Sequence, residues 1–181
     1  MAEASKPPVV KLICGMISAR VGLFDAAAAA LGEAFGPIDH VSEVMDFDFT
    51  HYYDEEMGSP LFRRFVSFAE PVEADVLADA KLRTNAIEAD FARRQRDLRR
   101  PINLDPGYLE PSKLVLASMK NFTHRIYLGR GVYAEVTLLH RQGRWEALEW
   151  TFPDYASGRY DAFLTVVRDR LRRQLRQEAR A

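Results

Sequence analysis

The segment FDFTHYYDEEMG, residues 47–58, holds the densest group of side chains able to ligate a metal ion. Its oxygen and imidazole donors are Asp48, His51, Glu55 and Glu56. On a helix, His51 and Glu55 would share one face because they are four residues apart. One imidazole among carboxylates suits a hard or borderline divalent cation, whereas the spacing matches no closed zinc site. The segment therefore has two interpretations, a divalent-metal site and a solvated turn.

A second group of chemically active side chains lies in residues 103–131, NLDPGYLEPSKLVLASMKNFTHRIYLGRG. Residues 111–134 contain several bases and no acid, and the sequence Asp-Pro-Gly at 105–107 is typical of a rigid turn. A lysine offers a point charge to a phosphate or carboxylate group, and an arginine offers a bidentate fork. The alternative is that these bases occupy the exposed ends of strands. The residues predicted to bind a small anionic ligand are Asp105, Tyr108, Lys113, Lys120 and Arg125.

The charges of the chain are segregated along the sequence. Residues 21–62 contain nine acids and neither lysine nor arginine, so the other residues hold all 25 bases against 17 acids. Opposite charges of this kind either neutralise each other on the surface of one fold or form a cation site that faces an anion site. Under the second interpretation, the basic stretch after residue 107 meets the 47–58 segment across one cleft.

Two further features lie in the C-terminal half of the chain. Glu135 occurs in VYAEVT among apolar neighbours, so it either faces solvent or is buried with a partner. If it is buried, Glu135 becomes a candidate functional residue. A group of aromatic side chains forms either the wall of a site or, as the favoured interpretation, part of the core. These aromatic residues are Trp150, Phe152, Tyr155 and Tyr160.

The composition limits the classes of function. A hydrophobic fraction of 48% and a charged fraction of 28% indicate a globular chain, and a net charge of −1 gives no general attraction to nucleic acid or anionic lipid. The single cysteine, Cys14, lies in the apolar run KLICGMIS, which predicts a buried thiol in a reducing compartment. The chain shows no signal-peptide pattern, no membrane-spanning run and no phosphate-loop motif. We therefore expect a cytoplasmic protein without a nucleic-acid or membrane partner.

The elements that position these side chains are predicted from the spacing of apolar residues. The apolar run at 9–17 predicts a strand that is buried on both faces. Further strands are predicted at 38–49, 61–68, 123–128, 132–140 and 144–150, with 114–117 as a strand or a short helix. Helices are predicted at 21–35, 72–98 and 158–177.

The order of these elements predicts the fold class. The first six elements run strand, helix, strand, strand, helix, strand, which is the ferredoxin-like βαββαβ arrangement. We predict an α+β fold with a mixed or antiparallel sheet, helices mainly on one face, and a β-meander and a C-terminal helix after the βαββαβ start. Residues 1–8 are predicted to be a disordered tail, and residues 9–178 are predicted to form a single domain.

Five stretches of the chain, which together span about residues 9–165, resemble a known family. They are KLICGMIS, FDFTHYYDEEMG, INLDPGYLEPSKLVLASMKN, HRIYLGRGVYAEVTL and WTFPDY. The family is an uncharacterised prokaryotic one, the domain of unknown function numbered 4416. The resemblance implies a stand-alone protein of about this length, and it brings no established activity and no catalytic residue.

Three hypotheses for the function remain open. The first is a binding domain for a small anionic or phosphorylated molecule, with Lys113, Lys120 and Arg125 on the anion. The second is an enzyme that acts on a phosphoester with a divalent metal held by the donors of residues 48–56, where the metal activates water. The third is a non-catalytic module whose acidic segment docks a basic protein partner.

Overall fold

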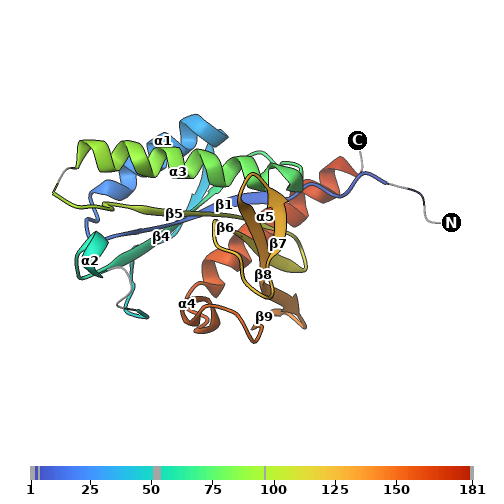
Figure 1. Cartoon of the computed structure of the whole chain (residues 1–181). Coiled ribbons are helices and arrows are strands. Elements are labelled where there is room, and N and C mark those ends of the chain that lie inside the picture. Colours follow the sequence, from blue (N-terminus) through green and yellow to red (C-terminus); the bar gives the residue numbers. More distant parts are fainter. Residues whose placement is uncertain (1–2, 4, 51–53, 96, 180–181) are drawn as a thin grey trace.

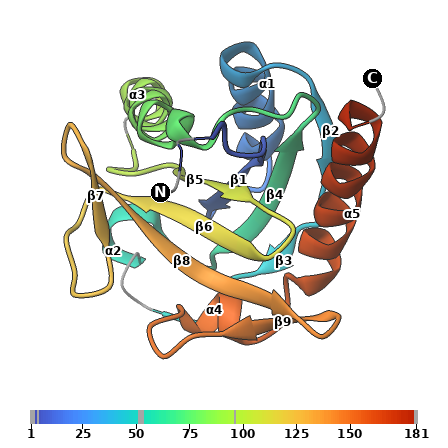
Figure 2. The ribbon, with the colours of Figure 1, turned by 90° about the vertical axis from the view of Figure 1, so that its right-hand side faces the viewer.

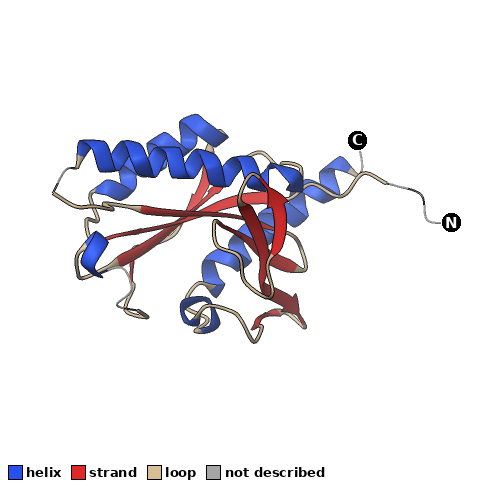
Figure 3. Cartoon of the chain, in the orientation of Figure 1, coloured by secondary structure: helices blue, strands red, loops and turns tan. Residues whose placement is uncertain are grey.

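The computed structural model describes residues 3, 5–50, 54–95 and 97–179. The described residues form one antiparallel sheet of nine strands with helices packed on it (Figures 1 and 3). The strands follow the path β2-β4-β1-β5-β6-β8-β7, while β3 pairs with β4 and β9 pairs with β8. The α+β class and the antiparallel sheet predicted from the sequence are confirmed.

Most elements lie where the apolar spacing predicts them. The strands are β1 (Lys11–Ser18), β2 (Ile38–Val41), β3 (Met45–Asp46), β4 (Phe62–Phe68), β5 (Asn103–Leu109), β6 (Lys113–Ser118), β7 (Ile126–Gly129), β8 (Val132–Arg141) and β9 (Arg144–Ala147). The helices are α1 (Leu23–Phe35), α2 (Asp54–Met57), the 3₁₀ turn η1 (Ala74–Val76), α3 (Leu77–Arg94), α4 (Pro153–Ala156) and α5 (Asp161–Glu178). The strand predicted at 38–49 is divided into β2 and β3, and residues 114–117 lie in a strand.

The strand order confirms the ferredoxin-like start. β1 lies between β4 and β5, and β2 lies outside β4, so these four strands have the order β2-β4-β1-β5 of a βαββαβ sheet. β1 is buried along its whole length because it is central and both of its faces are covered. Its side chains alternate between two core clusters, with Leu12, Cys14 and Met16 in one and Ile13 in the other.

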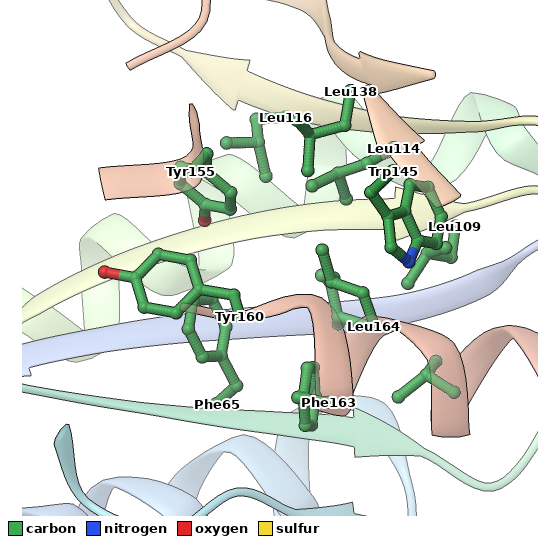
Figure 4. Close-up of a cluster of buried hydrophobic side chains, with 12 residues drawn as sticks. Phe65, Leu109, Leu114, Leu116, Leu138, Trp145, Tyr155, Tyr160, Phe163 and Leu164 are labelled. Atoms are coloured by element: carbon green, nitrogen blue, oxygen red, sulfur yellow. The ribbon is translucent and has the colours of Figure 1, made fainter. Parts of the chain in front are cut away.

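The two faces of the sheet are covered by different helices (Figure 1). α1 and α3 share one face, where Phe24, Leu31 and Ala80 pack on the strands. The shared face of α1 and α3 agrees with the prediction that the helices lie mainly on one face of the sheet. The C-terminal helix α5 adds cover to the opposite face, where Phe163 and Leu164 belong to the second cluster (Figure 4). The C-terminal segment is thus part of the main core.

The pairing between β5 and β6 is short, and Pro106 explains where it ends. The register of this pair runs over three residues of each strand and stops at Gly107 opposite Leu116. At the turn, the N–H of Glu110 donates to the carbonyl of Lys113 at 2.9 Å. In an antiparallel pair, every second residue of a strand directs its N–H to the same neighbouring strand. Going back along β5 from Glu110, the residues whose N–H would point to β6 are therefore 108 and 106. Proline has no N–H, so the ladder does not extend past Pro106 and the two strands separate.

The turn predicted at residues 105–107 is wrong, because these residues lie inside β5. A Cβ atom at Gly107 would lie 2.5 Å from the carbonyl oxygen of Val115, so glycine permits the close approach of β5 to β6. Proline and glycine therefore mark the end of a strand pairing here and not a reversal of the chain. Figure 2 shows β6 and β8 crossing the molecule diagonally beyond this point, with β7 at one side and β9 at the other.

Candidate functional site

A cavity of about 540 Å³ lies where β5 and β6 separate. Its lining comes from both sides of the sheet, since α3 contributes to it together with β4, α4 and the segments that follow β3 and β6. Small-molecule sites in proteins have volumes of about 300–1,000 Å³. The described charged residues of the lining are the bases Arg63, Lys81, Arg100, Lys120 and Arg125 and the acids Asp105, Glu135 and Asp154. Bases therefore outnumber acids among the described charged residues of the lining.

Arg63 is a buried cation at this cavity, with only 4% of its side chain exposed. Its Nη2 donates to Asp154 Oδ2 at 2.9 Å, and its Nη1 lies 3.9 Å from Asp105 Oδ2. Its Nε and Nη1 have no hydrogen-bond acceptor among the described residues. Burial acts to lower the pKa of Arg63, but the neighbouring acids, Tyr155 and Asp154 first in their anionic forms, hold it above its ordinary value, and at neutral pH the anions beside it are the carboxylates of Asp154 and Asp105. Arg63 therefore remains charged and keeps unused donors.

An aromatic cage fixes the position of the Arg63 guanidinium. Its carbon lies between 5.1 and 5.6 Å from the ring centroids of Phe47, Phe65, Tyr155 and Tyr160. Figure 4 shows Phe65, Tyr155 and Tyr160 gathered at one end of the core cluster. Contacts with ring faces stabilise a cation without accepting strong hydrogen bonds. The cage thus holds the guanidinium in place, while Nε and Nη1 have no acceptor among the described residues.

A second buried base, Lys81 of α3, reaches the cavity from the other face of the sheet. Its Nζ donates to the carbonyl of Leu104 at 2.9 Å and lies 3.7 Å from Asp105 Oδ1. Asp105 Oδ2 accepts a hydrogen bond from Asn103 Nδ2 at 2.6 Å. The carboxylate of Asp105 therefore lies between Lys81 and Arg63 and orients both bases.

Glu135 of β8 is a buried acid at the same cavity, and its two oxygens have different surroundings. Oε2 accepts a hydrogen bond from Arg125 Nε at 2.7 Å and lies 2.9 Å from His124 Nε2. Oε1 is buried and has no partner among the described residues. The expectation that Glu135 is either exposed or buried with a partner is resolved in favour of burial with Arg125 and His124.

Unpaired polar atoms converge on this cavity. Three of its lining side chains, Arg63, Glu135 and Tyr155, each have a buried nitrogen or oxygen with no partner among the described residues. Burial raises the pKa of Tyr155 well above its ordinary value, so its hydroxyl keeps its proton. Leaving a buried polar group unpaired costs about 1–3 kcal/mol, so such groups are normally satisfied. All three unpaired groups belong to residues that line the same cavity.

Three of the five residues predicted to bind an anion, Asp105, Lys120 and Arg125, line the cavity. Tyr108 and Lys113 do not lie among its lining residues. Because residues 105–109 form a strand, Asp105 and Tyr108 point to opposite faces of the sheet. Lys113 instead forms an ion pair with Glu110 at 2.9 Å, across the turn that joins β5 to β6.

The residues predicted to hold a metal form no such site in the part of the chain that the structure describes. Asp48 accepts a hydrogen bond from Arg159 at 2.9 Å, and this bond lowers the pKa of Asp48. Glu56 lies 3.7 Å from Arg99, and Glu55 is exposed. His51 lies outside the described residues. Within the described ranges, no three histidine, cysteine or acidic side chains are grouped as metal ligands.

Four of the nine acids of residues 21–62 form ion pairs with bases from elsewhere in the fold. The ion pairs are Asp25 with Arg64, Asp39 with Lys11, Asp48 with Arg159 and Glu56 with Arg99. The 47–58 segment does meet the basic segment at the cavity. It does so through Phe47, Phe49 and Thr50, and Asp48, Glu55 and Glu56 are not among the described lining residues. The described part of the segment therefore supplies two aromatic rings and a threonine to the lining.

Arg63, Lys81 and Asp154 are not among the functional residues predicted from the sequence. Arg63 had one signal, because it interrupts the apolar alternation of LFRRFVSF in a strand that is otherwise buried. Gly15, in the middle of the apolar run of β1, is the matching signal, since glycine in a strand marks a close approach. Lys81 and Asp154 have no comparable signal in the sequence.

The fold and the cavity define an α+β protein built on a ferredoxin-like sheet, with a charged cavity between two strands of the sheet. A family model described as "Domain of unknown function (DUF4416)" matches residues 8–171, so the chain belongs to this family and the resemblance is confirmed. Comparison with curated proteins and with solved structures gave no significant match. Among the described residues, no helix combines the length and apolar character that a membrane span requires.

Proposed function

We propose that the protein binds a small molecule with a carboxylate or phosphate group in the cavity between β5 and β6. The observation that carries this proposal is the state of Arg63. Its guanidinium is buried and charged, and two of its nitrogens have no acceptor among the described residues. An anion placed against Nε and Nη1 would receive charge-assisted hydrogen bonds in a fork geometry.

The surroundings of Arg63 support an anion over a neutral ligand. Lys81 adds a second buried positive charge, and Lys120 and Arg125 add basic groups on the far side of the cavity. Asp105 and Asp154 neutralise part of this charge and fix the direction of the buried bases. The apolar walls suit a ligand that also has a ring or a hydrocarbon part.

The test compares two adjacent arginines of β4. Arg63→Gln removes the buried cation, whereas Arg64→Gln removes a surface base that pairs with Asp25 at 2.7 Å. The probes are benzylphosphonate, inorganic pyrophosphate and citrate, and binding is measured by calorimetry at constant ionic strength. We expect one site per chain for at least one probe, binding weakened at least about tenfold by Arg63→Gln, and no change with Arg64→Gln.

Absence of binding by all three probes at concentrations well above a Kd of about 1 mM would contradict the proposal. Equal weakening by both variants would also contradict it, since that result indicates general charge attraction. Because Arg63→Gln disturbs a buried ion pair, its fold is checked by circular dichroism. Lys120→Ala, at an exposed lining position, provides a second variant that leaves the core intact.

A further inference from the structure

Glu135 differs from the other acids of the cavity, because one of its oxygens has two partners and the other has none among the described residues. Its side chain is 1% exposed, and it lies on β8 opposite Leu116 of β6. Oε2 has both Arg125 and His124 as partners, whereas Oε1 has none among the described residues. An ionised carboxylate accepts hydrogen bonds and donates none. The free oxygen therefore requires an N–H or O–H group.

The position of this oxygen is fixed by the residues behind it. Arg125 also donates from Nη1 to the carbonyl of Lys120 at 2.8 Å, which holds its guanidinium against Glu135. The His124 ring is stacked on Trp150 with 5.1 Å between centroids and 9° between planes. Neither partner can follow Glu135 far, so the carboxylate keeps one orientation. Because Glu135 Oε1 keeps one position, it cannot turn away when a ligand without a hydrogen-bond donor binds, and it therefore discriminates against such a ligand.

From this geometry we infer that the ligand is an acid that also carries a hydrogen-bond donor, such as an amino or hydroxyl group, and that the donor binds Glu135 Oε1. The inference rests on the proposed function, in which the acidic group binds Arg63. It goes further by defining the class of ligand as amino or hydroxy acids, in which the acidic group is a carboxylate, a phosphate or a phosphonate. A second anionic group placed at Glu135 would be repelled, so a ligand that brings an acidic group to Glu135 should bind more weakly than one that brings a donor.

The experiment uses aromatic phosphonates that differ in one group. Phenylphosphonate and benzylphosphonate are each compared with their 4-amino and 4-dimethylamino derivatives, which gives two ligand lengths. The amino derivative has an N–H donor, whereas the dimethylamino derivative has nearly the same ring and no donor. For at least one length, we expect the amino derivative to bind about tenfold more tightly than both of the others.

Variants then assign the preference to Glu135. Glu135→Gln retains the volume of the side chain and presents an amide in place of the carboxylate, so we expect it to abolish the preference for the amino derivative. The matched control is Glu146→Gln on β9, where the acid pairs with Arg144 at the surface. This control should retain the full preference. If Glu135→Gln fails to fold, the comparison of the amino and dimethylamino derivatives in the wild-type protein decides the question.

The outcomes separate this inference from the proposed function. If the unsubstituted phosphonates bind in a manner that depends on Arg63 but the amino group adds nothing at either length, the inference is overturned and the proposed function stands. A preference that survives Glu135→Gln also overturns it, because the donor is then bound elsewhere. If no phosphonate binds, the proposed function fails and the inference falls with it.

Discussion

Gly15 of β1 lies directly beneath the guanidinium of Arg63. A Cβ atom at position 15 would be 2.6 Å from Arg63 Nη1 and 2.9 Å from Cε1 of Phe65. Glycine in the middle of a strand lowers stability by about 0.5–1 kcal/mol relative to alanine. Its presence in a fully buried strand is therefore explained by the space that the buried cation needs.

Gly15→Ala is expected to lower the free energy of unfolding by about 1–3 kcal/mol, because the added methyl group overlaps a packed ring and the guanidinium. It should also weaken anion binding, since Arg63 has to move. Urea denaturation and calorimetry with benzylphosphonate measure the two effects. The control is Gly32→Ala in α1, where a Cβ meets no atom within 4 Å. That change should increase stability slightly, as alanine favours a helix. Equal stability of the two variants would contradict the argument.

Asp154→Asn is expected to be among the more destabilising single changes in the protein. It removes the negative charge that lies 2.9 Å from Arg63 Nη2, on the oxygen that also accepts a hydrogen bond from the hydroxyl of Tyr160. Loss of one member of a buried ion pair costs about 3–5 kcal/mol because the other charge is left uncompensated. Chemical denaturation measures the loss. Asp25→Asn, which breaks a surface pair with Arg64, should change stability little.

Added sulfate provides a second test of the same pair. An anion that enters the cavity would replace part of the missing charge, so sulfate should raise the denaturation midpoint of Asp154→Asn more than that of the wild-type protein. An equal effect on both proteins would indicate that the anion does not reach Arg63.

Gly107→Ala tests the close contact between β5 and β6. The new Cβ would lie 2.5 Å from a backbone carbonyl oxygen of Val115, and a backbone atom yields less readily than a flexible side chain. We expect a loss of about 3 kcal/mol or more, with faster amide hydrogen exchange in β6. A fully stable variant with unchanged exchange would show that the strands do not need this approach.

The stability of the protein should fall as the pH is lowered below neutrality. Burial, with Arg170 nearby, lowers the pKa of His40 from its ordinary value of 6.5, and burial with Arg168 nearby lowers that of His140. The unfolded chain then binds these protons more tightly than the folded protein. The stabilisation is complete above pH 6.5 and is lost as the pH falls through the lower folded pKa values.

Urea denaturation at several pH values between neutrality and mild acid measures this dependence. His40→Phe keeps a ring beside Phe163, on which His40 is stacked, but it does not titrate. The variant should therefore lose part of the pH dependence, and a second change at His140 should remove more. If wild-type and doubly substituted proteins lose stability in parallel, other groups are responsible.

The fold could be predicted largely from the sequence because its main elements carry strong local patterns. The apolar run of β1 and the helical stripes of α1, α3 and α5 each reflect burial of one element against the sheet. The turn predicted at residues 105–107 was wrong because proline and glycine occur both in turns and at the ends of strand pairing. Local sequence does not distinguish these roles, since the difference depends on which strand lies alongside.

The candidate site was predictable only in part. Lys120 and Arg125 lie in a stretch without acids, which predicts a basic site, and both line the cavity. Arg63, Lys81 and Asp154 come from three elements far apart in the sequence, and tertiary structure alone brings them together. Lys113 has the same residue type and lies in the same segment, but Glu110 engages it locally.

The short ladder between β5 and β6 also affects how cooperatively the protein unfolds on heating. Backbone pairing joins the βαββαβ half of the sheet to the β6–β9 half over only three residue pairs of β5 and β6. Helix α5 adds side-chain packing to this junction. A ligand bound in the cavity between β5 and β6 would contact both halves of the sheet and hold them together. Its arrival should slow amide exchange on both flanking strands at once and make the two halves melt as a more cooperative unit.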